Sequence, residues 1–321
     1  MKKAYINAIS YITPKKSFSN DDLVEEFPEW NVEKVASKIG IDKRFIADEN
    51  QSTSDLAVNA SEKLFKEHNI DRKIIDFIIL CTQSPDFTLP TTACIIQNKL
   101  GLNTNCGAFD FNLGCSGYTY GLAIAKGLIE SEIGHNILLI TSETYSKYLS
   151  KDDKSNRTIF GDAATATLIS HTGFASIEKF VLGTDGSGAE NLIVRNSGSK
   201  KEINESDRLY MNGPEIYNFT LKSVPKLVEG VLQKNNVLSS EIDLYIFHQA
   251  NLFMLTHLRR KLKIESEKFY TYMKKVGNTV SSTIPIALYH AMKEDKIKTG
   301  NTVLLAGFGV GYSWAGNILK F

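Results

Sequence analysis

The chain contains one pattern of strand, helix and strand twice, once in each half. In the first half, an apolar run over 108–113 leads to Cys115, a helical pattern covers 120–130, and Asn136 begins another apolar run. In the second half, Asn278 precedes a helical pattern over 284–292 and a run that starts at Asn301. The intervals from 115 to 136 and from 278 to 301 each hold one helix and a glycine-containing turn. This spacing predicts one βαβ-rich unit used twice.

Strands alternate with amphipathic helices along the rest of the chain, a pattern typical of a layered α/β fold. Helical patterns over 54–68 and 219–235 each lead into a strand, at 77–81 and 244–248, and another helix is predicted near 91–100. The length of 321 residues exceeds one average domain. With the seam of the repeat near 170–174, we expect two related α/β halves, residues 1–170 and 171–321.

Composition excludes several classes of function. The 37 Lys and Arg residues balance 36 Asp and Glu residues, so no net field attracts nucleic acid or a membrane surface. Residues 1–16 are too polar for a secretion signal, and no segment approaches the roughly eighteen apolar residues of a membrane span. A cytoplasmic protein is expected. The spacing of the four cysteines (Cys81, Cys94, Cys106 and Cys115) suggests neither a disulfide framework nor a metal site.

Cys115 is the best candidate for a reactive nucleophile. It lies between Gly114 and Gly117, where an apolar run changes into a helical pattern. The N-terminus of a helix carries about half a positive charge and unpaired N–H groups, which favour a thiolate and predict a lowered pKa for Cys115. The alternative is that Cys115 is a small buried packing residue.

Two residues of the second half complete a candidate site. If a pseudo-twofold axis relates the halves, Asn278 faces Cys115 at the centre, and His248 reaches the same place from the end of its strand. Such a set suits acyl transfer: a thiolate attacks a thioester, imidazole handles protons, and a carboxamide adds a neutral hydrogen-bond donor for an enolate. Taken singly, His248 could be an ordinary strand-end residue and Asn278 a turn former.

The motifs around these residues resemble those of the β-ketoacyl-acyl-carrier-protein synthase III family. The similarity runs from Tyr5 to Phe321 and rests on residues 114–117 (Gly-Cys-Ser-Gly), 247–251 (Phe-His-Gln-Ala-Asn), 277–279 (Gly-Asn-Thr) with 281–285 (Ser-Ser-Thr-Ile-Pro), and 307–314 (Gly-Phe-Gly-Val-Gly-Tyr-Ser-Trp). The resemblance implies a thiolase-like fold with α-β-α-β-α layers and a homodimer. It also implies an acyltransferase that loads an acyl group from CoA onto a cysteine and condenses it with malonyl on acyl carrier protein, without a metal or redox cofactor.

Carried over by position, the resemblance makes Cys115 the acylated nucleophile. His248 and Asn278 would bind the malonyl thioester oxygen and stabilise the enolate. The backbone N–H groups of Cys115 and Val310 would form the oxyanion hole. The family usually has glycine where Val310 stands; valine keeps the N–H but has a narrower range of φ.

The same comparison assigns substrate-binding residues. Gly213 and Asn251 match positions that contact the phosphopantetheine arm, and Phe160 matches a residue that lines the pocket. Leu89 matches the residue that reaches across the dimer to close the acyl pocket, where members restricted to acetyl tend to have phenylalanine. Because leucine is smaller, we expect tolerance of a primer longer than acetyl.

Departures from the family pattern concern the delivery of the primer. In the family, a tryptophan and an arginine sandwich the CoA adenine. Lys34 and Lys154 stand at the matching positions, and the loss of the two planar groups removes about 1–3 kcal/mol of stacking free energy. Phe253 replaces a frequent arginine at the tunnel mouth. Positive charge on the following helix could dock an acidic carrier protein or could simply be a solvated helix face; it comes from Arg259, Arg260 and Lys261.

These departures predict a specialised relative that takes an acyl-carrier donor or serves a polysaccharide, lipid or secondary-metabolite pathway. One alternative is an enzyme of the same fold that transfers the acyl group to a hydroxyl or an amine. A catalytically silent scaffold subunit is another, although retention of Cys115, His248 and Asn278 argues against it.

Overall fold

The computed structural model describes residues 3–29, 31–203 and 205–321, without side-chain placement for residues 32–35. Within these residues, ten strands form one mixed sheet that consists of two five-stranded parts. The first part is β1 (Tyr5–Ile12), β4 (Phe77–Cys81), β5 (Gly107–Phe111), β6 (Asn136–Glu143) and β7 (Ala163–Ser170). The second part is β8 (Ala175–Thr184), β11 (Leu244–Phe247), β12 (Phe269–Tyr270), β13 (Thr302–Gly309) and β14 (Ser313–Lys320).

The two parts have the same strand order. Counted outward from the junction, the first part runs β1-β7-β6-β4-β5 and the second β8-β14-β13-β11-β12. They meet where β1 pairs with β8 through two residue pairs, Tyr5 with Ser176 and Ile6 with Ala175. The predicted α/β fold with two related halves is confirmed. The domain boundary between residues 170 and 171 stays a prediction; β7 ends at Ser170 and β8 begins at Ala175.

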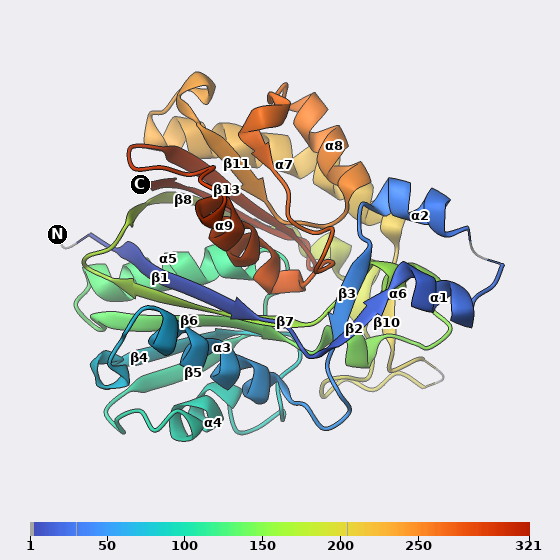
Figure 1. Cartoon of the computed structure of the whole chain (residues 1–321), viewed down its shortest axis with the longest axis horizontal. Helices are drawn as coiled ribbons and strands as arrows, with labels where there is room; N and C mark the ends of the chain where they lie inside the picture. The colour runs from blue at the N-terminus through green and yellow to red at the C-terminus, as the bar shows by residue number, and fades with distance from the viewer. Residues whose placement is uncertain (1–2, 30, 204) are drawn as a thin grey trace.

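Helices cover both faces of each five-stranded part of the sheet and fill the space between the two parts. Helices α3 (Thr53–Glu67) and α4 (Thr92–Lys99) cover the outside of the first part, and α7 (Gly213–Asn235) and α8 (Leu252–Lys261) cover the second. Helices α5 (Gly117–Glu130) and α9 (Thr283–Lys293) lie between them (Figure 1). Both faces of β4 are therefore buried, Ile79 against the central helices and Ile78 and Leu80 against the outer ones. This burial explains the continuous apolar runs in the sequence.

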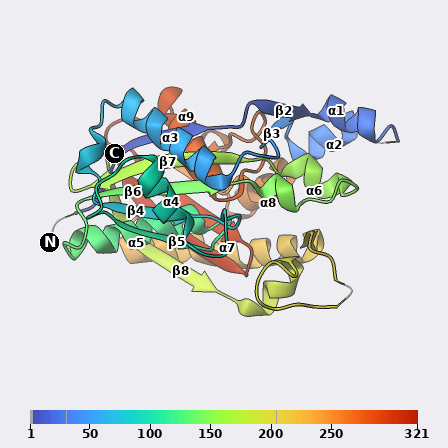
Figure 2. The same ribbon diagram turned by 90° about the horizontal axis from the view of Figure 1, so that it is seen from below.

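Smaller elements gather at the end of the molecule opposite the two termini (Figures 1 and 2). They are β2 (Lys16–Ser19), β3 (Lys43–Ile46), α1 (Asn20–Glu26), α2 (Val32–Ile39) and α6 (Lys154–Ile159). A further two-stranded sheet consists of β9 (Leu192–Val194) and β10 (Leu209–Met211). Short 3-10 turns cover Arg72–Ile74, Tyr145–Tyr148, Gly186–Asn191, Ser239–Glu241, Ser266–Lys268 and Val280–Ser282.

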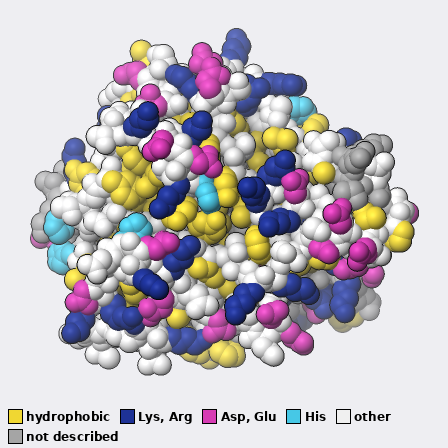
Figure 3. Space-filling view, viewed as in Figure 1, with side chains coloured by type: hydrophobic (Ala, Val, Ile, Leu, Met, Phe, Trp, Pro, Cys, Tyr) yellow, Lys and Arg dark blue, Asp and Glu magenta, His cyan; other side chains and the backbone are white. Residues whose placement is uncertain are grey.

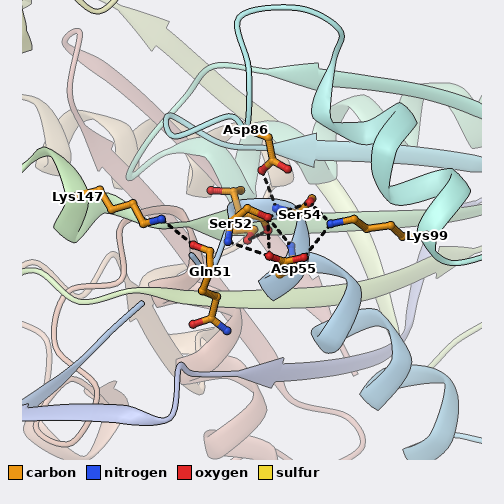
Figure 4. A network of polar contacts seen from close by, with 9 residues as sticks. Gln51, Ser52, Ser54, Asp55, Asp86, Lys99 and Lys147 are labelled. Carbon is orange, nitrogen blue, oxygen red and sulfur yellow. Dashed lines mark hydrogen bonds and ion pairs between the residues drawn. The ribbon is translucent and has the colours of Figure 1, made fainter. Parts of the chain in front are cut away.

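A polar network fixes the start of α3 to its neighbours (Figure 4). Ser52 and Asp55 form a capping box, in which each side chain accepts a hydrogen bond from the backbone N–H of the other residue. Lys99 of α4 pairs with Asp55 at 2.7 Å, and Lys147 donates to the carbonyl oxygen of Gln51 at 2.8 Å. The cap therefore ties α3 to α4 and to the segment that follows β6.

The predicted element boundaries differ from the observed ones in two places that matter for the site. The first is the strand predicted over 108–113, which ends at Phe111, while the next helix begins at Gly117 rather than residue 120. The second is the helix predicted from 219, which begins at Gly213, where Asn212 caps it and Pro214 occupies the first turn. Its first buried side chain is Phe219, so the apolar pattern marks the buried part of α7 and not its start.

Charges of both signs are interspersed on the face drawn in Figure 3, and hydrophobic side chains gather near its middle. This distribution agrees with the formal net charge of +1. No helix among the described residues is long and apolar enough to span a membrane.

Candidate active site

A cavity of about 150 Å³ lies where the two halves meet. It opens at the carboxyl ends of the parallel strands β11 and β13, next to the first turns of α7 and α8. Its wall includes six of the residues that the sequence pointed to: Cys115, Phe160, Gly213, His248, Asn251 and Asn278. Residues from distant parts of the chain therefore meet in one place.

The loop after β5 holds Cys115 just before α5, whose N-cap is Ser116. Close packing around this loop requires glycines. A Cβ at Gly117 would lie 2.2 Å from the sulfur of Cys81, and a Cβ at Gly309 would lie 2.8 Å from the Sγ of Cys115. Only 7% of Cys115 is exposed. The thiol is thus held against the end of β13 with little freedom to move.

Burial raises the pKa of Cys115 to about 12. Hydrogen bonds from the backbone N–H groups of Val310 and of Cys115 itself lower it again, but by less. The prediction that the helix start lowers this pKa is therefore wrong. Removal from water destabilises the thiolate by more free energy than the hydrogen bonds from these two N–H groups restore. The resting residue is a thiol. The same two N–H groups are those predicted for the oxyanion hole, and φ of Val310 is outside the left-handed region, so valine fits there.

Replacing Gly309 with alanine should lower the rate of acyl loading about tenfold. The new Cβ would lie 2.7 Å from the Cβ of Cys115, which no real pair of carbon atoms tolerates, so the nucleophile must shift. Gly127→Ala is the matched control, because its Cβ meets nothing within 4 Å. The measurement is the rate of adduct formation by intact-protein mass spectrometry; equal rates in the two variants would contradict the prediction.

His248 follows β11 directly, as predicted, and its N–H donates to the carbonyl oxygen of Ala306 at 2.8 Å. Burial lowers the pKa of His248 to about 3, so the imidazole is neutral at physiological pH. Its Nδ1 lies 2.7 Å from the Oγ1 of Thr283, and the Thr283 hydroxyl is 3.1 Å from the carbonyl oxygen of Val280. Nε2 is thus the ring nitrogen available to a substrate.

The single proton of the Thr283 hydroxyl links the tautomer of His248 to the backbone. When the hydroxyl donates to Nδ1, Nε2 carries a hydrogen and can donate to a substrate oxygen. When the hydroxyl donates to Val280, Nδ1 carries the hydrogen and Nε2 accepts a proton. Thr283 therefore permits both functions of a neutral histidine.

Asn278 is oriented by the same short segment. Its Oδ1 accepts a hydrogen bond from the N–H of Val280 at 2.9 Å, and its Nδ2 donates to the carbonyl oxygen of Ala250 at 3.5 Å, which leaves the second hydrogen of Nδ2 for a substrate oxygen. Val280 has φ of 54°, a left-handed conformation that is a genuine outlier for a β-branched residue. The residue is 1% exposed, so the surrounding core holds this conformation. The strained backbone of Val280 therefore helps to orient two side chains. Its N–H bonds to Asn278, and its carbonyl oxygen accepts from Thr283, the partner of His248.

Val280 and Thr283 contact Asn278 and His248, and the sequence alone did not single them out. Thr283 lies in the motif used for the resemblance, and Val280 is the residue between its two parts, but neither is assigned a role there. The run of hydroxyl residues after Asn278, Thr279 and Ser281–Thr283, is the signal that could have pointed to Thr283. A left-handed valine has no signal in a single sequence.

Of the other predicted substrate residues, Asn251 and Gly213 line the cavity, whereas Leu89 and Phe253 do not. Asn251 caps α8 by accepting a hydrogen bond from the N–H of Met254 at 2.8 Å, and Gly213 begins α7. Leu89 is 80% exposed in the segment between β4 and α4. Phe253 lies on α8, half exposed, with its ring 4.2 Å from that of His257, and does not line the cavity.

The two lysines at the expected adenine site are not equivalent. Lys154 begins α6, where it pairs with Glu29 and lies 4.9 Å from the ring centre of Phe27. The side chain of Lys34 lies outside the described residues. The three basic residues of the expected docking face occupy the last turn of α8, where they also complement the helix dipole: Arg259, Arg260 and Lys261.

A buried carboxyl group, Glu143, lies behind the site at the end of β6. It accepts hydrogen bonds from the Ser84 hydroxyl at 2.8 Å, from the Ser281 hydroxyl at 3.1 Å and from the N–H of Gln83 at 3.1 Å. Burial nevertheless raises the pKa of Glu143 to about 8 from 4.5. Among the described residues, no group of three or more His, Cys, Asp or Glu side chains could hold a metal ion.

The free energy of unfolding should depend on pH through Glu143. Because its pKa is higher in the folded protein, the stabilising contribution of its proton is fully present below pH 4.5 and is lost as the pH rises through about 8. The stability of the native protein relative to Glu143→Gln should therefore fall across this window, by up to about 1.4 kcal/mol per pH unit. Urea unfolding at several pH values measures this difference. A difference that is flat, or no larger in its slope than that of the exposed Glu25→Gln, would contradict it.

Comparisons with known proteins agree with the fold. Residues 109–186 match the family model described as 3-oxoacyl-[acyl-carrier-protein] synthase III, and residues 232–321 match its C-terminal counterpart. The β-ketoacyl-[acyl-carrier-protein] synthase III of Clostridium perfringens (strain ATCC 13124) is 38% identical over 328 residues, which cover 100% of both chains. That of Campylobacter jejuni subsp. doylei is 37% identical over 325 residues, which cover 100% of this chain and 98% of the relative.

Solved structures lead to the same family. A crystal structure of a 3-oxoacyl-(acyl-carrier-protein) synthase III superposes with a TM-score of 0.96 at 43% identity, covering 99% of this chain and 100% of the other. The 3-oxoacyl-(acyl-carrier protein) synthase of Burkholderia xenovorans LB400 gives a TM-score of 0.92 at 36% identity, covering 98% and 93%. The chain belongs to the β-ketoacyl-[acyl-carrier-protein] synthase III family, the acyl-transferring condensing enzymes with a thiolase-like fold.

Proposed function

We propose that this chain transfers an acyl group from a thioester to Cys115 and condenses it with malonyl on acyl carrier protein. One observation carries the proposal: Cys115, His248 and Asn278 line a single buried cavity between the two halves. Much of the cavity wall is apolar, so hydrogen bonds to developing charge are stronger there than in solvent.

In the first step, the Sγ of Cys115 attacks the carbonyl carbon of the acyl thioester. A carbon–sulfur bond to Cys115 forms, the bond to the carrier sulfur breaks, and the thiol proton leaves with the departing thiol. The N–H groups of Cys115 and Val310 stabilise the oxyanion of the tetrahedral intermediate, since both are directed toward this sulfur.

In the second step, the malonyl thioester loses carbon dioxide, and the electron pair becomes an enolate. Nε2–H of His248 and Nδ2 of Asn278 donate hydrogen bonds to the enolate oxygen. The enolate carbon then attacks the acyl carbonyl, the bond to Cys115 breaks, and the released thiolate takes up a proton. A neutral histidine suits this role because the donated hydrogen stays on the nitrogen.

Release of carbon dioxide from malonyl thioesters tests this function. Acyl-dependent release together with a 3-oxoacyl product supports condensation. Acyl transfer to a hydroxyl or amine without release would instead favour a transferase of the same fold, and a failure of every donor to modify Cys115 would favour a silent subunit.

We further propose that the acyl donor is a carrier protein rather than CoA. Lys154 is paired with Glu29 and cannot supply the planar stacking surface of an arginine. At the tunnel mouth, Phe253 stands where the family often has an arginine. Arg259, Arg260 and Lys261 would contact the acidic carrier protein. Steady-state comparison of acetyl-CoA with acyl carrier donors decides this point; strong preference for acetyl-CoA would overturn it.

A homodimer is the assembly that best fits the exposed surface near the site. β5 is the outermost strand of its half of the described sheet, and Phe87 and Leu89 are 61% and 80% exposed next to it. Pairing of two copies along β5 would cover the strand edge and would bring Leu89 to the acyl pocket of the other copy. Light scattering after size exclusion should give twice the chain mass of 35.8 kDa. Independence from cofactors and a cytoplasmic location stay predictions.

A further inference from the structure

A second cavity, of about 220 Å³, lies beside the loop that carries Cys115. Leu192 lines both cavities, and Val310, which packs in one cluster with Cys115, lines the second one. Several other residues of its wall carry polar groups: Gln83, Asn112, Tyr145, Tyr148 and Ser197. The two cavities therefore share part of a wall, and the lining of the second one is unusually polar for a pocket that would take the alkyl tail of an acyl group on Cys115.

Two of these polar groups have no partner. The Oε1 of Gln83 is buried without a hydrogen bond, while its Nε2 donates to Asn112 at 3.1 Å. The hydroxyl of Tyr145 makes no hydrogen bond to any described residue, although the side chain is only 4% exposed. Native proteins rarely leave buried polar atoms unpaired, so such groups call for a ligand or an ordered water.

Both groups lie close to the nucleophile. The Gln83 oxygen is 2.5 Å from the position that a Cβ on Gly114 would take, and Gly114 directly precedes Cys115. The ring of Tyr145 packs at 5.1 Å from that of Phe160, which lines the catalytic cavity, and Tyr145 belongs to the same buried cluster as Cys115. By contrast, Tyr148 already donates to the carbonyl oxygen of Gln83 at 3.1 Å.

We propose that the primer of this enzyme is a short acyl group that carries a hydroxyl on its chain. The hydroxyl would accept a hydrogen bond from Tyr145 and, once the Gln83 side chain turns its amide oxygen into the cavity that it lines, donate one to that oxygen. An unsubstituted alkyl chain offers neither group a hydrogen-bond partner, so both would stay unpaired. This inference rests on the proposed acylation of Cys115 and adds the chemical class of the primer.

Competition between matched primers tests the proposal. Butyryl and 3-hydroxybutyryl thioesters are supplied together, on CoA and on acyl carrier protein, and the two adducts of Cys115 are resolved by intact mass. We expect the hydroxylated adduct to form about ten times faster. Tyr145→Phe and Gln83→Leu, which keep the side-chain volume, should each reduce this ratio toward one. Tyr120→Phe, which removes a hydroxyl bonded to Gly183 outside the cavity, should keep the native ratio.

Each outcome has a separate meaning. Equal rates for the two primers, or a ratio that neither variant changes, would show that ordered water satisfies the two groups and would overturn the proposal while leaving acylation intact. A failure of all primers to modify Cys115 would instead contradict the proposed function. Because the readout is a ratio within one sample, partial unfolding of a variant does not affect it.

Discussion

Replacing Cys115 with serine should reduce acyl loading and condensation at least about a thousandfold. Serine has nearly the same shape and keeps the backbone N–H of the oxyanion hole, so the change isolates the nucleophile. Burial already raises the pKa of the thiol to about 12, and a hydroxyl in the same place would be far harder to deprotonate. Intact mass spectrometry after incubation with acyl donors measures loading, and 3-oxoacyl product measures condensation.

The matched control is Cys94→Ser, which changes a cysteine outside both cavities, on α4, whose sulfur donates to the carbonyl oxygen of Thr91. It should load at the native rate. An adduct that persists at native yield in Cys115→Ser would assign the nucleophile to another residue. Decarboxylation of malonyl without an acyl group should survive, because His248 and Asn278 remain.

The fold could be predicted to a large extent because two patterns in the sequence determine it: the apolar runs of buried strands and the repeated order of strand, helix and strand. Buried strands such as Phe77–Cys81 appear as apolar runs, and the repetition of strand, helix and strand shows in the spacing of Cys115 and Asn278. The antiparallel pair of β2 and β3, which are separated in the chain by α1 and α2, is not predicted from the sequence. Its strands are four residues each and partly exposed, so they lack the alternation that identifies a strand.

The residue types of the site could also be predicted, but their physical state could not. The sequence places Cys115 at a helix start, which argues for a low pKa, whereas the depth of burial that raises it depends on packing against Gly309 from the other half. The same holds for the tautomer of His248, which depends on Thr283, and for the unpaired hydroxyl of Tyr145. Contacts between distant segments decide each of these properties.

His248→Ala and Asn278→Ala should each reduce condensation about a hundred- to a thousandfold while acyl loading of Cys115 stays near the native rate. Each variant removes one donor to the enolate oxygen, and that charge develops only in the second step. Because burial lowers the pKa of His248 to about 3, its protonation does not change between pH 5 and 9. Condensation by the native enzyme should therefore show no titration near pH 6.5.

Single-turnover measurements on enzyme acylated beforehand separate the two steps. The control is Gln249→Glu, next to His248, whose side chain bonds to the backbone of Phe247 and Tyr272 and does not line the cavity. Its effect should fall on stability and not on the ratio of condensation to loading. Thr283→Val tests whether the Thr283 hydroxyl supports His248. Without this hydroxyl, Nδ1 of His248 loses its partner, so condensation should fall although every group that contacts the substrate is retained. Loss of loading and condensation in equal proportion in His248→Ala and Asn278→Ala would contradict this division of labour, and would place both residues in the first step.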